Sequence, residues 1–213
     1  MVRANYEFNR NFGDAEFALL FAFTGTGGFF GSGEVLPFNW PIEFDRFVDE
    51  SGGVPARSAR KIDTRLAPPL GEMSNQVTDL PDGAIKEIMA HLAVRNLLRG
   101  YLLSLPTGQA VAQVVGAPPL TAEELRRNNS ARLNEVLTEA GFLDRTPLWY
   151  YLLKEAEVRA HGETLGPVGS RIVAETFVGV LYEDSTSYVN NGWDPSRGVR
   201  LGDGGVITTL KDF

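Results

Sequence analysis

Cysteine is absent from this chain of 213 residues, and histidine occurs only twice. Without cysteine the chain can form neither disulfides nor thiolate metal sites. His91 and His161 fit no recognisable Ser-His-Asp or Cys-His nucleophile pattern. Apolar runs of about 18 residues are also missing, so no transmembrane segment is predicted. These absences exclude several classes of site and leave an ordinary globular protein.

Basic residues are also fewer than acidic ones. The chain has 20 Lys and Arg against 27 Asp and Glu, a net charge of −7. This balance argues against a nucleic-acid partner, whose binding surfaces are usually basic. With 43% hydrophobic and 22% charged residues, we expect a soluble protein with one substantial core. The first residues lack the apolar centre of a signal peptide, and the compartment is left open.

Strand patterns are scarce and helical patterns frequent. The sequence predicts one mainly α-helical domain over residues 1–213, with long loops and little strand. Thr121 and Glu124 form a capping-box pattern that predicts a helix start. A short strand or ordered arm is expected near 206–210, and loops at 24–33 and 51–80. Helices are expected at 83–104, 131–140, 147–160 and 167–184, at 39–50 after Pro41, and at 1–10 as the end of a longer helix.

The helix predicted at 83–104 carries two kinds of surface. One stripe places Arg95, Asn96 and Arg99 among leucines at i, i+3, i+4 spacing. The opposite stripe is apolar and includes Val94, Leu97, Leu98 and Tyr101. An amide or guanidinium placed among leucines is costly unless a partner is supplied. An anionic cofactor is one such partner.

Three segments resemble the animal-type haem peroxidase superfamily, in its bacterial branch. Arg95–Pro106 resembles the helix in which that family has an Asn, an Arg three residues later and then a Leu-Pro pair. Lys61–Leu70 resembles the loop before this helix. The third segment resembles the family's carboxy-terminal helices and their short link; it consists of Leu148–Glu157, followed by Gly166–Val178 and Glu183–Tyr188. The resemblance extends to about residue 194.

The resemblance implies a haem cofactor and two residues that serve it. Asn96 would accept the hydrogen bond of the axial histidine, which fixes the imidazole ring and tunes the iron. Arg99 would face a haem propionate, because a planar guanidinium suits a carboxylate. The implied activity is reduction of hydrogen peroxide coupled to oxidation of a small reductant, as in a response to oxidative stress.

The chain departs from the family pattern at its beginning. Met1-Val2-Arg3 resembles the end of the run that holds the axial histidine, which would lie before Met1. The family's distal histidine and arginine and its calcium loop would lie further upstream. We therefore expect a truncated domain that is inactive alone, with no catalytic residue and no metal ligand of its own. The alternatives are a fatty-acid dioxygenase of the same fold and a non-catalytic fragment that only binds.

Other candidate residues have simpler structural interpretations. Helical spacing places His91 about 140° from Asn96, so it is expected to be a partly exposed helix residue. His161 is expected at a helix end, and Glu155 and Glu157 on the surface, since residues two apart do not face each other on a helix. The Gly-rich segment 24–33 lacks the Gly-Lys-Ser/Thr of a phosphate loop. The aromatic residues expected in the core are Trp149, Tyr150 and Tyr151.

Overall fold

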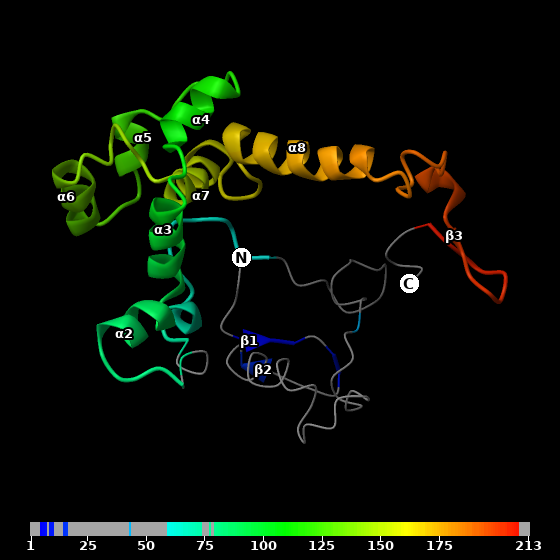
Figure 1. Cartoon of the computed structure of the whole chain (residues 1–213), viewed down its shortest axis with the longest axis horizontal. Coiled ribbons are helices and arrows are strands. Elements are labelled where there is room, and N and C mark those ends of the chain that lie inside the picture. The colour runs from blue at the N-terminus through cyan, green and yellow to red at the C-terminus, as the bar shows by residue number, and fades with distance from the viewer. Residues whose placement is uncertain are drawn as a thin grey trace. The chain divides into compact units, whose positions relative to one another are not determined.

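The computed structural model describes residues 5–7, 9–10, 15–16, 43, 59–73, 77 and 79–208. Within this part of the chain the structure is mainly helical, as predicted. Two antiparallel pairs of two-residue strands accompany the helices (Figure 1). β1 (Asn5–Tyr6) pairs with β2 (Ala15–Glu16), and β3 (Val199–Arg200) pairs with β4 (Val206–Ile207). The strand expected near 206–210 is therefore present in its first two residues.

The helices predicted at 131–140, 147–160 and 167–184 are confirmed. None of the helices in the described residues is both long enough and apolar enough to span a bilayer. Two short 3-10 helices are η2 (Pro68–Leu70) and η4 (Pro195–Arg197). The α-helices are α2 (Ala84–Ala90), α3 (Leu92–Leu102), α4 (Gly108–Val114), α5 (Ala122–Arg126), α6 (Ala131–Glu139), α7 (Leu148–Arg159) and α8 (Pro167–Glu183).

The contacts of the chain divide it into two compact units. One unit comprises residues 61–176, and the other comprises residues 2–60 together with 177–213. The first unit contains α2 to α7 and the first part of α8. A single domain over 1–213 stays a prediction.

The helix predicted at 1–10 is wrong. Asn5 and Tyr6 are extended and pair with Glu16 and Ala15. Their backbone hydrogen bonds are thus made across the pair instead of within one segment, which satisfies the same donors and acceptors in a different way. The helix predicted at 39–50 and the glycine-rich loop at 24–33 lie outside the described residues, except for Glu43.

The helix predicted at 83–104 is broken at His91. This residue has extended backbone angles, φ −103° and ψ 105°, and it separates α2 from α3. The carbonyl of Ala90 accepts a hydrogen bond of 2.8 Å from the N–H of Met73, and the guanidinium of Arg95 donates to the carbonyl of Met89 at 3.3 Å. A loop and a side chain therefore satisfy two carbonyls that a continuous helix would use itself.

The core of the first unit surrounds Tyr151 on α7. Helix α7 contacts α3, α4 and α5, and it lies where these helices meet in Figure 1. Tyr151 is fully buried, and its hydroxyl accepts a hydrogen bond of 2.9 Å from the N–H of Leu120. The buried residues packed together here are Ala112, Leu120, Leu125, Tyr151 and Val168. Of the three aromatic residues predicted in the core, Tyr151 is completely enclosed and Trp149 and Tyr150 are half-buried.

The predicted capping box at the start of α5 is confirmed. The Thr121 hydroxyl accepts from the N–H of Glu124 at 3.2 Å, and the Glu124 carboxylate accepts from the N–H of Thr121 at 2.8 Å. Thr107 and Ser130 cap α4 and α6 in a similar way, each accepting from a backbone N–H three residues later. These side chains satisfy N–H groups that a helix leaves without internal partners.

Replacing Gly108 by alanine is expected to destabilise the first unit by about 3 kcal/mol. A Cβ at position 108 would lie only 2.0 Å from Cγ of the buried Tyr151, so the ring or α4 would have to move. Thermal unfolding of G108A measures the loss. G100A is the matched control: its new Cβ meets only Leu105, at 3.8 Å, and the substitution favours the helix. Equal melting temperatures for the two variants would contradict the expected clash.

Candidate functional site

An apolar cavity of about 520 Å³ lies beside α3 and the start of α7 in the first unit. Its size and its mainly apolar walls are typical of small-molecule and cofactor sites. The walls come from α3, from the segment after it, from the end of α6 and from the start of α7. The lining residues are Asn96, Leu97, Leu98, Gly100, Tyr101, Leu105, Pro106, Thr107, Ala140, Phe142, Arg145, Pro147, Leu148 and Trp149. We refer to it as the Asn96 cavity.

Two polar side chains in this lining have hydrogen-bonding capacity to spare. The amide of Asn96 is half-buried and makes no hydrogen bond with a described residue. The guanidinium of Arg145 is exposed and likewise forms no ion pair within the described ranges. An amide and a cation beside apolar and aromatic walls suit a flat or elongated apolar ligand that carries an acidic group.

The two residues that the resemblance implied are placed differently. Asn96 lines the cavity, as a role toward a cofactor requires. Arg99, three residues later on α3, is exposed and is not part of the lining. Residues three apart on a helix are neighbours, so a group that leaves the cavity beside Asn96 can reach Arg99. Arg145, from the loop before α7, is a cation in the lining that the sequence analysis did not select.

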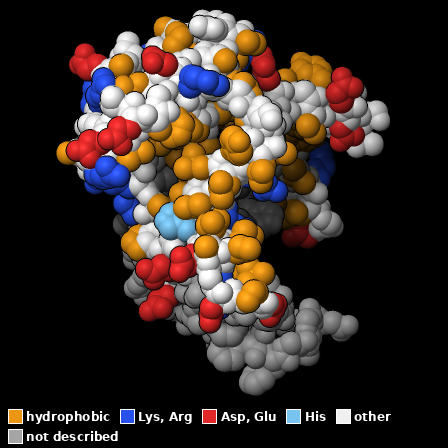
Figure 2. Space-filling model, turned by 60° about the vertical axis from the view of Figure 1, so that its left-hand side comes forward, with side chains coloured by type: hydrophobic (Ala, Val, Ile, Leu, Met, Phe, Trp, Pro, Cys, Tyr) orange, Lys and Arg blue, Asp and Glu red, His pale blue; other side chains and the backbone are white. Residues whose placement is uncertain are grey.

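Apolar side chains continue from the cavity onto the surface of α3 and the residues after it. Tyr101 is 81% exposed and Leu102 is 78% exposed. Figure 2 shows hydrophobic side chains gathered in a band across this face, with charged side chains around them. The exposed apolar residues of this segment are Leu97, Leu98, Tyr101, Leu102, Leu103 and Leu105. Both stripes of this helix were predicted to contact a partner. At these exposed apolar residues the described part of the chain supplies none.

Neither histidine lines the Asn96 cavity. His91 sits at the break between α2 and α3, where its Nδ1 is buried without a hydrogen-bond partner among the described residues. His161 follows the end of α7 in a left-handed conformation, φ 53°. Within the described part of the chain, no three His, Asp or Glu side chains come together in a way that could hold a metal ion.

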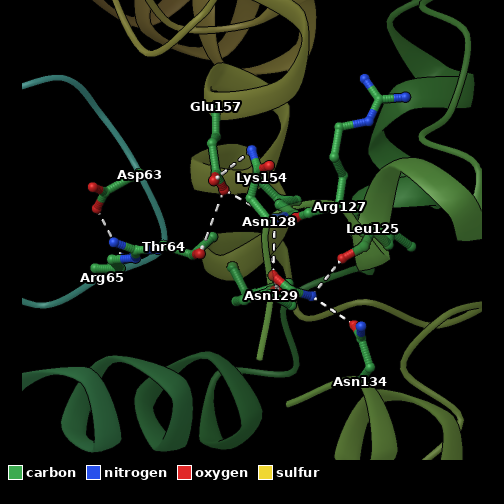
Figure 3. Close-up of polar contacts among 11 residues, drawn as sticks. Asp63, Thr64, Arg65, Leu125, Arg127, Asn128, Asn129, Asn134, Lys154 and Glu157 are labelled. Carbon is green, nitrogen blue, oxygen red and sulfur yellow. Dashed lines mark hydrogen bonds and ion pairs between the residues drawn. The ribbon is translucent and has the colours of Figure 1, made fainter. Parts of the chain in front are cut away.

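A buried lysine organises a second polar region in the same unit. Lys154 on α7 is fully buried, and its ammonium contacts the carboxylate of Glu157 and the side-chain oxygen of Asn129, each at 2.9 Å. It also donates to the carbonyl of Arg127. Figure 3 shows this arrangement, with Glu157 reaching on to Asn128. All three ammonium protons have acceptors, which is what a buried charge requires.

The prediction that Glu155 and Glu157 are surface charges is wrong. Glu155 is fully buried, and its Oε2 accepts from the N–H groups of Val168 at 3.0 Å and Gly169 at 3.3 Å, at the start of α8. Burial raises the pKa of Glu155, and these two hydrogen bonds oppose the rise. The side chain of Glu157 is only 15% exposed, because Lys154 lies against it. The two carboxylates do diverge, as helical geometry demands, but toward different buried partners.

Sequence reasoning had no signal for Arg145 or Lys154. Arg145 precedes Pro147 in a loop, where no periodicity assigns a facing direction. Lys154 lies between Leu153 and Glu155 on a predicted helix, a pattern compatible with either a solvated or a buried lysine. Comparisons with family models, with curated proteins and with solved structures give no match to this chain.

Proposed function

We propose that the Asn96 cavity forms one wall of a haem site and that the chain serves a haem peroxidase. The activity would be reduction of hydrogen peroxide with oxidation of a small reductant. One observation carries the proposal: a half-buried amide without a described partner lies in an apolar, aromatic cavity of about 520 Å³. Haem, when bound, supplies the iron at which peroxide reacts.

The residues of the cavity fit the cofactor in three respects. Leucine, phenylalanine and tryptophan side chains offer apolar surface to a macrocycle and exclude water from it. The oxygen of Asn96 can accept the N–H of an axial imidazole and so orient its ring. Arg99, or Arg145 in the lining, can pair with a propionate at the edge. The imidazole itself must come from outside the lining, since neither histidine belongs to it.

Titration of the full chain with hemin and added imidazole, which supplies the axial ligand that the lining lacks, tests the proposal. We expect a one-to-one change in the Soret band, together with quenching of the fluorescence of Trp149, which lines the cavity. A W149F variant, titrated in parallel, isolates that quenching from the other tryptophans. N96L should bind hemin at least about tenfold more weakly, as is usual when a supporting partner of a ligand is removed. Unsaturable binding, or equal binding by N96L, would contradict the assignment of this cavity.

Two arginine variants locate the partner of the propionate. The resemblance predicts that R99Q weakens hemin binding, whereas R145Q tests the cation that the structure places in the lining. A loss confined to R145Q would move the role from Arg99 to Arg145. Peroxide-dependent oxidation of a chromogenic phenol, compared with free hemin, then separates a working enzyme from a chain that only binds.

A further inference from the structure

A polar cleft of about 500 Å³, separate from the Asn96 cavity and independent of the proposed function, lies against the Lys154 region. It lies between the segment 61–65, the end of α7 and the turn after α5. Lys61, Asp63, Arg65, Asn128, Glu157 and His161 contribute to its lining. We call it the Arg65 cleft.

The two sides of this cleft are joined by backbone contacts. The N–H of Ile62 donates to the carbonyl of Gly162 at 2.7 Å. A Cβ at position 162 would lie 2.5 Å from the carbonyl oxygen of Ile62, so the two segments approach more closely than any other residue would allow. Gly162 also has φ +71°, a conformation that favours glycine. The two sides of the cleft are therefore held in place by contacts between segments that are distant in sequence.

Both carboxylates of the cleft already accept hydrogen bonds from described residues. The Glu157 carboxylate accepts from Lys154 at 2.9 Å, from Asn128 at 3.2 Å and from Thr64 at 3.5 Å (Figure 3). Oδ1 of Asp63 accepts the backbone N–H of Arg65 at 2.8 Å. The negative charge of Glu157 is balanced by the buried ammonium below it. These contacts leave the cleft with little demand for a cation.

The donors of the cleft are, by contrast, mostly unused. The guanidinium of Arg65 and the imidazole of His161 make no hydrogen bond or ion pair with any residue that the structure describes. Lys61 has one ion pair of 3.3 Å with Glu163, and both side chains are largely exposed, so this pair holds the lysine only weakly. Arginine presents a planar set of donors that matches the two oxygens of a carboxylate or phosphate group.

From this imbalance we infer that the Arg65 cleft binds a small oxyanion, a phosphate or a carboxylate group. Arg65 makes the principal contact, and His161 and Lys61 contribute further donors. The fixed carboxylates of Glu157 and Asp63 limit the site to an anion that approaches from the side of Arg65, and they restrict the number of charges that it accepts.

Titration with inorganic phosphate and with acetate, followed by amide NMR at constant ionic strength, tests the inference. We expect saturable shifts for residues 61–65, for Asn128 and for 161–162. The R65Q variant should weaken binding about tenfold, because it removes charge-assisted hydrogen bonds. H161N, which keeps a residue tolerant of the left-handed conformation, should weaken it less. R132Q removes an exposed arginine elsewhere and should bind like the parent.

The two anions distinguish the sources of the oxyanion. Tighter binding of phosphate identifies a phosphate group, and tighter binding of acetate identifies a carboxylate; both results support the site. Shifts that rise linearly with either anion, or equal binding by R65Q and R132Q, would overturn it. Arg65 is exposed, so R65Q should fold, and an unchanged amide spectrum away from the cleft verifies this.

Discussion

Replacing Lys154 by methionine is expected to lower the free energy of unfolding by about 3–5 kcal/mol, although methionine has a similar length and fills the same space. The ammonium of Lys154 is fully buried and holds the Glu157 carboxylate at 2.9 Å. Methionine removes the positive charge and leaves that carboxylate, at 15% exposure, without its closest counter-charge. The carbonyl of Arg127 loses a donor as well.

A second substitution separates the charge effect from the packing effect. In K154M/E157Q the uncompensated charge is gone, while the glutamine oxygen can still accept from Asn128 and its NH2 group can donate to the Thr64 hydroxyl. We expect this double variant to recover a substantial part of the stability that K154M loses, because breaking a buried pair costs more than replacing it. Urea unfolding measures both. A loss below about 1 kcal/mol in K154M would show that the pair contributes no more than a surface ion pair.

Acid should weaken the fold through the pair of Glu124 and Arg159. Nε of Arg159 donates to Oε1 of Glu124 at 2.9 Å, and Nη2 donates to Oε2 at 3.0 Å, which is the two-pronged geometry of a strong pair. The same guanidinium donates to the carbonyls of Pro118 and Pro119. Hydrogen bonds from Arg159 lower the pKa of Glu124 from 4.5 to about 2.

The sign of the effect follows from this lowered pKa. The carboxylate binds its proton less readily in the folded state, so its stabilisation is present in full above pH 4.5 and disappears as the pH falls toward 2. Both side chains are about one-fifth exposed, so solvent screening weakens the pair. After this reduction we expect the pair to contribute about 2–3 kcal/mol to the free energy of unfolding.

The E124Q variant measures this contribution directly. Glutamine keeps an acceptor for the N–H of Thr121 and so preserves the capping box while removing the charge. E124Q should be less stable than the parent at pH 7 and nearly equal to it near pH 2. E135Q, which breaks the exposed pair with Arg132, should change stability by less than about 1 kcal/mol at either pH. The same pH dependence in E124Q and in the parent would contradict the assignment.

Both effects depend on α7, the helix that also contributes the core tyrosine and two walls of ligand-sized cavities. Tyr151 faces the core, Trp149 faces the Asn96 cavity and Glu157 faces the Arg65 cleft. One helix therefore links the packing of the first unit to both candidate sites. A substitution at either site can therefore also change the stability of the first unit, which unfolding measurements detect.

The sequence by itself determined the features that arise within a few residues. The capping box of Thr121 and Glu124 places the start of α5, and apolar periodicity places α6, α7 and α8, because these signals act through hydrogen bonds and contacts between near neighbours. Asn96, which the resemblance singled out, lines a cavity in the structure, and its role toward a cofactor stays a prediction.

Only the tertiary structure decided the features that depend on distant partners. The N–H of Met73 donates to the carbonyl of Ala90 and helps to end α2 before His91. The N–H of Val168, at the start of α8, donates to the Glu155 carboxylate and stabilises it in the interior. The carbonyl of Arg127, just after α5, accepts a hydrogen bond from Lys154 and so allows this lysine to be buried. The loop before α7 places Arg145 in the wall of the Asn96 cavity. Local patterns do not contain these contacts, because each depends on a donor or acceptor supplied by another part of the chain.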